Sequence, residues 1–111
     1  MSDSYQIEWT EHALSMLDET ISYIVADSPA NALRILGRIQ SRIDKLGESP
    51  ATGRYVPELL EFGIRTYREL IVKPWRIIYR VTDRTVHIMI FIDSRRNVGD
   101  YLMRELYRGK L

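Results

Sequence analysis

The sequence contains no cysteine and only two histidines, His12 and His87, among its 111 residues. Without cysteine the chain has neither a disulfide framework nor a thiolate metal site, and two histidines so far apart argue against a zinc centre. Absence of cysteine also fits the reducing cytoplasm. We therefore expect a cytoplasmic protein that needs no metal or other cofactor.

The chain also lacks long apolar runs, internal repeats and low-complexity tracts. No stretch approaches the roughly 18 apolar residues of a membrane span, and residues 1–5 show no basic region followed by an apolar one, as a secretory signal would. Hydrophobic residues make up 45% of the chain and charged residues 28%, which is ordinary for a soluble globular protein. The length fits a single domain over residues 1–111, with no membrane contact.

Charge is distributed unevenly along the chain, although the net charge is only +1. Residues 1–63 hold five Lys/Arg and ten Asp/Glu, whereas residues 64–111 hold eleven and five. The basic half consists of strand-like runs that carry arginines and end in Asp93-Ser94-Arg95-Arg96. Arginine presents a planar fork suited to phosphates and carboxylates, so an anionic partner is one hypothesis. The alternative is that these arginines only solvate one face of a sheet.

The first half of the chain predicts a strand followed by a helical hairpin. Apolar and polar residues alternate over 5–9, which is typical of a half-buried strand, and Thr10 stands where a helix N-cap belongs. Apolar residues at helical spacing predict a first helix over 12–26. Ser28-Pro29 then predicts the start of a second helix, which we expect to stop at Gly47.

One face of the predicted second helix is basic, because Arg34, Arg38 and Arg42 recur every four residues with Lys45 beside them. Such a ridge either binds a partner or is simply solvated, and the pattern does not decide between the two.

The second half predicts an antiparallel meander. Residues 48–63 contain Pro and Gly without periodicity and indicate a connecting loop, whereas 64–72, 75–81 and 86–92 are rich in branched and aromatic residues. Residues 82–85 supply a hairpin turn, and residues 97–111 suggest a short helix over the end of the sheet. The expected fold is therefore α+β: an N-terminal strand, a two-helix hairpin and a three-stranded meander that completes one sheet packed on the helices.

Alternation within the strands predicts which residues share a face. In the middle strand Ile77 and Tyr79 lie on one side and Arg76 on the other, and in the last strand Ile88, Ile90 and Ile92 are expected on one side. Both faces are largely apolar, so the hairpin should cover one face and another segment should shield part of the second.

This order of elements carries specific residues that resemble the RelE/ParE toxin superfamily. They are Trp9-Thr10 with Ala13, Ser28-Pro29 with Ala32, Leu46 with Pro50 and Gly53-Arg54, Tyr67-Arg68-Glu69-Leu70, and Trp75-Arg76-Ile77-Ile78-Tyr79-Arg80-Val81. The resemblance covers nearly the whole chain. It implies the toxin of a type II toxin–antitoxin pair, neutralised by direct binding of its cognate antitoxin in a hetero-oligomer.

The superfamily contains two activities, and the residues bear on both. RelE-like members cleave messenger RNA on the ribosome, and on that hypothesis the resemblance assigns catalytic roles to Arg76, Arg96 and Tyr101. The strand positions where those enzymes carry lysines read Tyr67 and Glu69 here, so the machinery for stabilising phosphate charge is incomplete.

No replacement acid–base pair stands out in the sequence. His87 is predicted in mid-strand, His12 reads as a first-turn helix residue, and Glu58 and Glu61 are loop carboxylates that are expected to be solvated. Whether the protein is an enzyme stays open, with the balance against it.

ParE-like members poison DNA gyrase without known nuclease activity, and this is the function that we favour. Candidate partner-binding residues are Arg65, Arg68, Arg95 and Arg96, with residues 64–65 opening a strand that serves as a sheet edge. An inactive toxin that only binds antitoxin is a third hypothesis. On either active hypothesis, alanine at Arg76 or Arg96 is expected to leave folding largely intact, since neither side chain should lie in the helix-covered core.

Overall fold

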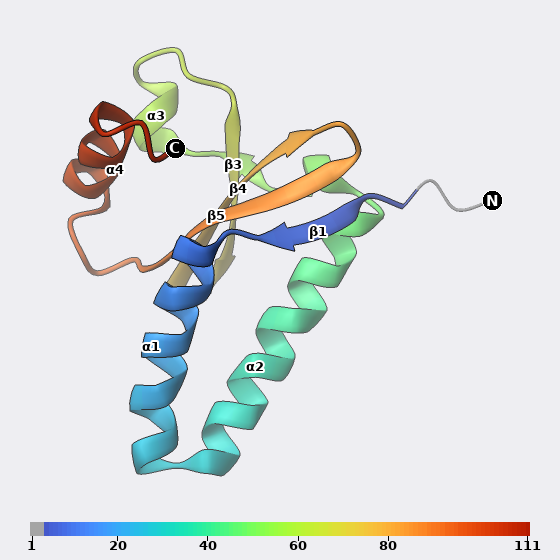
Figure 1. Cartoon of the computed structure of the whole chain (residues 1–111), viewed down its shortest axis with the longest axis vertical. Helices are drawn as coiled ribbons and strands as arrows, with labels where there is room; N and C mark the ends of the chain where they lie inside the picture. The colour runs from blue at the N-terminus through green and yellow to red at the C-terminus, as the bar shows by residue number, and fades with distance from the viewer. Residues whose placement is uncertain (1–3) are drawn as a thin grey trace.

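The computed structural model describes residues 4–111, so the first three residues of the N-terminal stretch assessed for a secretory signal lie outside the described part. Helices and 3₁₀ turns, in chain order, are α1 (Glu11–Asp27), α2 (Pro29–Asp44), η1 (Lys45–Gly47), η2 (Pro50–Thr52), α3 (Pro57–Leu60) and α4 (Val98–Tyr107). Strands are β1 (Gln6–Trp9), β2 (Arg54–Tyr55), β3 (Tyr67–Val72), β4 (Trp75–Thr82) and β5 (Thr85–Asp93). Figure 1 shows helices on both faces of the sheet.

The five strands form one sheet in the order β1-β5-β4-β3-β2. The predicted meander is confirmed as antiparallel pairs of β3 with β4 and of β4 with β5, and β1 joins the far edge parallel to β5. The short strand β2 pairs with the outer side of β3 and was not predicted. It places Arg54 opposite Glu69.

Helices α1 and α2 form the predicted hairpin and cover one face of the sheet. The Thr10 and Ser28 side chains cap the two helices by accepting hydrogen bonds from the backbone N–H groups of Ala13 and Asn31. Their buried residues pack on the sheet in a core that includes Ile39 and Ile77. The tip of the hairpin extends beyond the sheet (Figure 1), and Tyr23 near this tip is 82% exposed.

A β-bulge in β5 changes which face the last strand presents. Ile78 pairs with Ile90 but Tyr79 pairs with Ile88, so Met89 is an extra residue in the register. As a result Ile88 packs in the core under α1 and α2, whereas Ile90 and Ile92 pack on the opposite face. The prediction that these three isoleucines share a face is therefore wrong, because strict alternation fails at a bulge.

The second face of the sheet is covered by α3 and α4. Leu59 of α3 and Val98 and Leu102 of α4 pack with Ile78 and Ile90 in a second apolar core. This confirms that another segment shields the face, and that the C-terminal tail forms a helix.

Two predicted boundaries are wrong in this region. Residues 48–63 are not a plain loop, because they contain η2, β2 and α3. Strand β3 begins at Tyr67 rather than at 64, so Arg65 precedes the strand instead of opening its edge. No helix within residues 4–111 combines the length and the apolar composition that a membrane span requires.

Candidate functional site

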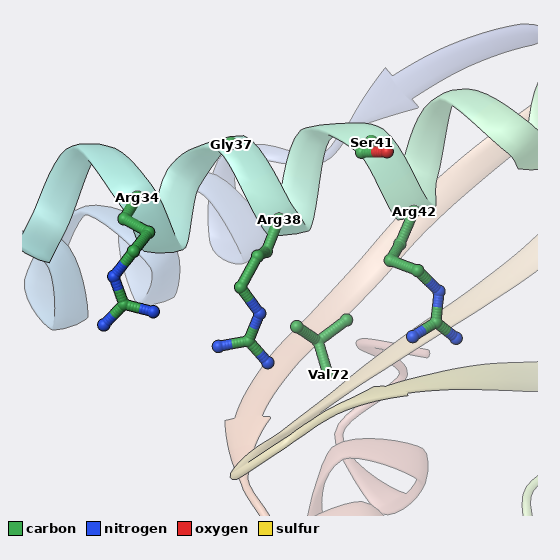
Figure 2. Close-up of a pocket in the computed structure, with 6 residues that line it drawn as sticks. All are labelled: Arg34, Gly37, Arg38, Ser41, Arg42 and Val72. Carbon is green, nitrogen blue, oxygen red and sulfur yellow. The ribbon is translucent and has the colours of Figure 1, made fainter.

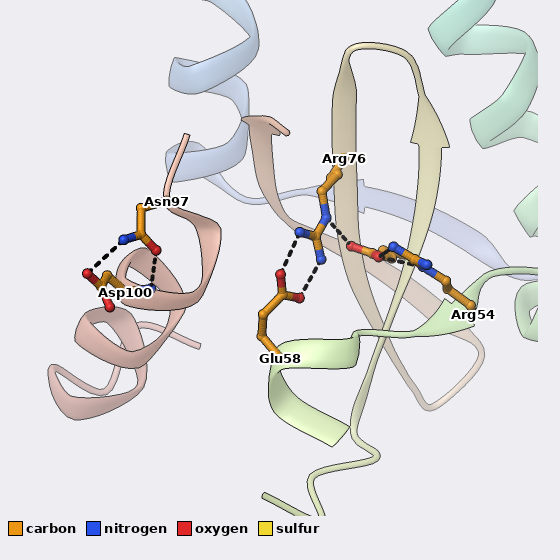
Figure 3. Close-up of polar contacts among 6 residues, drawn as sticks. Arg54, Glu58, Arg76, Asn97 and Asp100 are labelled. Carbon is orange, nitrogen blue, oxygen red and sulfur yellow. Dashed lines mark hydrogen bonds and ion pairs between the residues drawn. The ribbon is translucent and has the colours of Figure 1, made fainter. Parts of the chain in front are cut away.

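Arg76 lies at the centre of a chain of four charged side chains on the α3-covered face of the sheet (Figure 3). Its Nη1 and Nη2 atoms donate to the two carboxylate oxygens of Glu58 at 2.8 and 2.6 Å, and its Nε donates to Glu69 Oε1 at 2.8 Å. The other oxygen of Glu69 accepts from Arg54 Nε at 2.8 Å. The chain therefore joins β4, α3, β3 and β2 and contains two positive and two negative charges.

Because two of these charged side chains are buried, each of them depends on its ion-pair partner. Glu69 is 1% exposed and Arg76 is 7% exposed, so neither charge could be accommodated there without its partner. Hydrogen bonding to Arg76 lowers the pKa of Glu58 below its usual range, against the opposing effect of partial burial. The same bonds with Glu58 raise the pKa of Arg76 further above its already high value.

These contacts correct two expectations. Glu58 is held by Arg76 rather than solvated, and Arg76, although it lies outside the core under α1 and α2 as expected, is buried in an ion-pair network. Alanine at Arg76 is therefore not expected to leave folding intact. Glu58 and Glu69 together compensate the charge of the arginine.

The lowered pKa of Glu58 gives a pH dependence to folding. A carboxylate whose folded pKa lies below its unfolded value of about 4.5 stabilises the fold above that pH, and the contribution is lost as the pH falls through the folded pKa. On acidification below about pH 4.5 the free energy of unfolding should thus fall more steeply in the parent than in Glu58→Gln. Urea unfolding followed by circular dichroism between pH 3 and pH 7 measures this, and parallel curves would contradict it.

Arg96 and Tyr101 come together at a second place, between α1 and α4. The Arg96 guanidinium lies 5.7 Å from the centre of the Tyr101 ring, and the Tyr101 hydroxyl is hydrogen-bonded to His12 Nε2 at 2.6 Å. His12 Nε2 also lies 3.4 Å from Glu105 Oε1, a carboxylate on a residue that is 6% exposed. Burial is the largest cause of the raised pKa of Tyr101.

His12 is thus more than a first-turn helix residue, and sequence reasoning missed its contact with Tyr101. The two residues are 89 positions apart, so no local pattern could have revealed it. Within residues 4–111, no hydrogen bond or ion pair links Arg76 to Arg96 or Tyr101, so the three residues assigned to ribonuclease chemistry are not one connected cluster.

Arg95 and Arg96 follow β5 and line a groove of about 490 Å³ between α1 and the adjoining ends of β4 and β5. Arg95 is bound in two places to Asp93, with Nε–Oδ1 at 2.9 Å and Nη2–Oδ2 at 2.5 Å. This contact lowers the pKa of Asp93 to about 2. Arg96 is exposed, and among residues 4–111 it has no carboxylate within ion-pair distance.

The other two predicted partner-binding residues lie elsewhere. Arg68 donates to the Gly53 carbonyl at 2.9 Å and lies 4.2 Å above the Tyr55 ring, so it already holds the β2 segment in place. Arg65 is exposed and precedes the start of β3, whereas Arg95 follows the end of β5. The end of β5 lies at the same end of the sheet as the end of β3, because both pair with the same residue of β4. Arg65 and the Arg95-Arg96 pair are therefore at opposite ends of the sheet.

The arginines of α2 line a separate groove of about 460 Å³ against the outer side of β3. Figure 2 shows Arg34, Arg38 and Arg42 pointing to the same side, with Val72 beneath them. Arg38 and Arg42 donate to the backbone carbonyls of Lys73 and Ile71 at 3.4 and 3.1 Å, and Arg34 donates to the Asn31 side chain. They therefore lie along the part of the sheet edge that β2 leaves unpaired, rather than on a fully solvated face.

A family model described as the ParE toxin of the type II toxin–antitoxin system parDE matches residues 7–98. This match spans the sheet and both helices of the hairpin, and it includes Arg76, Arg95 and Arg96. The chain belongs to the ParE toxin family. It is a type II toxin of the ParE/RelE superfamily, and the resemblance noted in the sequence is confirmed.

Relatives of this ParE family member carry names from both branches of the superfamily. The chain is 40% identical over 93 residues to Y4kP of Sinorhizobium fredii, covering 82% of this chain and 90% of that protein. It is 38% identical over 85 residues to toxin RelE2 of Caulobacter vibrioides, covering 76% and 89%. Toxin ParE3 of the same organism is 36% identical over 67 residues, covering 60% and 63%.

Solved structures confirm the α+β fold of this ParE family member. The chromosomal ParDE system of P. aeruginosa superposes with a TM-score of 0.65 at 22% identity, covering 83% of this chain and 98% of that chain. The RelBE2 toxin–antitoxin complex of Mycobacterium tuberculosis superposes with a TM-score of 0.57 at 17% identity, covering 81% and 91%. Within residues 4–111, no group of three or more His, Asp and Glu side chains is placed to hold a metal ion.

Proposed function

We propose that this toxin acts by poisoning DNA gyrase and that a cognate antitoxin neutralises it by direct binding. The observation that carries the proposal is that Arg76 is fully paired with carboxylates. Each of its three guanidinium nitrogens donates to a carboxylate, and the two carboxylates come from Glu58 and Glu69. RNA cleavage by a 2′-hydroxyl requires cations that are free to stabilise the charge developing on the phosphate, and this arginine is already neutralised.

Support for the antitoxin comes from membership of a toxin family and from the unpaired cations of the chain. Arg34, Arg38 and Arg42 are free of carboxylate partners among residues 4–111 and lie beside an open sheet edge. An extended acidic segment could pair with both features. Since gyrase acts on chromosomal DNA, the proposal places the protein in the cytoplasm, in a toxin–antitoxin hetero-oligomer when it is neutralised.

One arrangement favours the ribonuclease alternative. His12 and the Tyr101 hydroxyl are joined by a 2.6 Å hydrogen bond beside Arg96, and a histidine with a nearby cation is a plausible acid–base centre. This centre lacks the strand lysines of the RelE-like enzymes and does not include Arg76. It is therefore the second candidate.

Expression of the toxin without antitoxin distinguishes the two functions. We expect replication to stop and cleaved DNA to accumulate covalently bound to gyrase, while bulk messenger RNA stays intact. Purified gyrase with supercoiled plasmid should show the same cleavage complexes in vitro. Rapid messenger RNA cleavage with normal gyrase activity would contradict the proposal.

Tyr101→Phe serves as the matched variant in that experiment, because it removes only the hydroxyl that contacts His12. A gyrase poison should keep its toxicity in this variant, whereas a ribonuclease using this hydroxyl should lose about 10²–10⁴ in rate. A parent chain that is harmless, with both gyrase and messenger RNA unaffected, would instead indicate an inactive antitoxin-binding regulator.

A further inference from the structure

The groove beside Arg95 and Arg96 has an aromatic floor. Trp75 and Phe91 lie there with ring centres 5.7 Å apart and planes inclined by 24°. They are 7% and 2% exposed, so their positions are set by the core beneath them. Tyr23 of α1 lines the same groove and is 82% exposed, so its ring is accessible to a partner.

The rim of the groove carries charges of both signs, and only some are compensated. Arg95 is paired with Asp93, which leaves Arg96 as the uncompensated cation on the β5 side. Glu19 of α1 lines the same groove, and it has no basic partner among residues 4–111. An uncompensated cation and an uncompensated carboxylate thus lie on different elements around an apolar floor.

We propose that this groove is the surface through which the toxin grips the gyrase protein, by receiving an apolar or aromatic side chain that is flanked by opposite charges. The anchor side chain lies over Trp75 and Phe91, an adjacent carboxylate pairs with Arg96, and a basic group on the other side faces Glu19. Aromatic and arginine side chains around a desolvated pocket are the usual hot spots of protein interfaces. The inference rests on the proposed function, since gyrase is the partner that it names.

The charged residues that line the two grooves distinguish the surface proposed for gyrase from the one proposed for the antitoxin. A uniformly acidic segment fits the α2 groove, where three arginines have no carboxylate among the described residues. The groove beside Arg96 also holds Glu19, whose uncompensated carboxylate would repel such a segment, whereas Asp93 is paired with Arg95. The structure therefore favours a partner of mixed charge at this position and predicts two distinct binding surfaces.

The experiment measures the affinity of immobilised gyrase, and separately of the antitoxin, for variants of the full chain. Tyr23→Ala removes the exposed aromatic, and Leu33→Ala is its control, since Leu33 is 72% exposed near the same hairpin tip but does not line the groove. We expect Tyr23→Ala to weaken gyrase binding at least about tenfold and Leu33→Ala less than about threefold.

Charge reversals test the polarity of the groove. Arg96→Glu and Glu19→Lys should each weaken gyrase binding about tenfold or more, whereas Asp18→Lys, next to Glu19 but outside the groove, should change it less than about threefold. Antitoxin binding and the melting temperature should be nearly unchanged in all five variants, which shows that each one is folded.

The binding measurements distinguish failure of this inference from failure of the proposed function. If the parent binds gyrase but Tyr23→Ala and Arg96→Glu bind equally well, the groove is not the gyrase surface, although the proposed function stands. Loss of antitoxin binding with gyrase binding retained would assign the groove to the antitoxin and overturn the inference. If the parent itself does not bind gyrase, the proposed function fails and this inference fails with it.

Discussion

Replacing Arg76 with alanine should lower the free energy of unfolding by about 3–5 kcal/mol. The substitution leaves the Glu69 carboxylate buried with only Arg54, whose side chain is 57% exposed, and releases Glu58 from the sheet. Urea unfolding of the purified toxin measures the loss. Arg96→Ala is the matched control, since Arg96 is exposed and unpaired by any carboxylate of residues 4–111, and it should cost about 0.5 kcal/mol or less.

A multiple variant identifies the source of that loss. Replacing Arg76 by methionine and both Glu58 and Glu69 by leucine removes the buried charges together, and Arg54 then reaches solvent. Buried ion pairs exchanged as a unit for apolar residues are often neutral or stabilising. The triple variant should therefore unfold at a higher urea concentration than Arg76→Ala. If Arg76→Ala unfolds like the parent, the network contributes little and its role in holding α3 is wrong.

This network changes how loss of toxicity must be interpreted. A harmless Arg76→Ala variant would be read as an inactivated ribonuclease if its stability were not measured. Because α3 is tied to the sheet through Glu58 and Arg76, the same substitution releases this helix, whereas β2 keeps its ion pair between Arg54 and Glu69. Only a variant that stays folded, such as the triple variant, separates a catalytic arginine from a structural one.

The hairpin and the antiparallel meander could be predicted because their signals are local. Thr10, Ser28 and Pro29 mark helix starts within one turn of the residues that they cap, and the alternation in β4 places Ile77 and Arg76 on opposite faces correctly. The tail helix followed from a short apolar pattern for the same reason.

The features that escaped prediction depend on contacts between distant residues. Met89 is an ordinary strand residue, and only pairing with β4 shows that it is a bulge. Strand β2 has two residues, too few for any periodicity, and it exists because β3 offers it an edge. Likewise the pairing of the Arg76 charge depends on Glu58, 18 positions away, and on Glu69. Periodicity along one segment contains none of this information.

Gly53 illustrates a second kind of constraint, a close approach of backbone to a buried side chain. Its N–H donates to the Tyr79 hydroxyl at 2.9 Å, and that hydroxyl donates to the Pro50 carbonyl at 2.6 Å. Tyr79 is fully buried, which raises the pKa of its phenol, so the hydroxyl has no access to water in place of these partners. The contact holds the segment that leads into β2 against the sheet.

Gly53→Ala should therefore destabilise the fold. A Cβ atom at this position would lie 2.5 Å from the Tyr79 hydroxyl and 2.6 Å from the Glu69 carbonyl oxygen, and neither a buried phenol nor a strand backbone can move away cheaply. Overpacking of this kind costs typically about 1–3 kcal/mol, and loss of the hydrogen bond to Tyr79 adds about 1 kcal/mol. Thermal unfolding of Gly53→Ala and the parent measures the combined loss of stability.

Gly37→Ala is the control with the opposite sign. Gly37 lies in the middle of α2, and a Cβ atom there would meet nothing within 4 Å. Alanine at such a position should stabilise the helix by about 0.5–1 kcal/mol. The two substitutions add the same methyl group, so opposite shifts in melting temperature would show that Gly53 is required by the contact with Tyr79. Equal shifts would mean that the β2 segment yields to the methyl group, and that Tyr79 does not hold it.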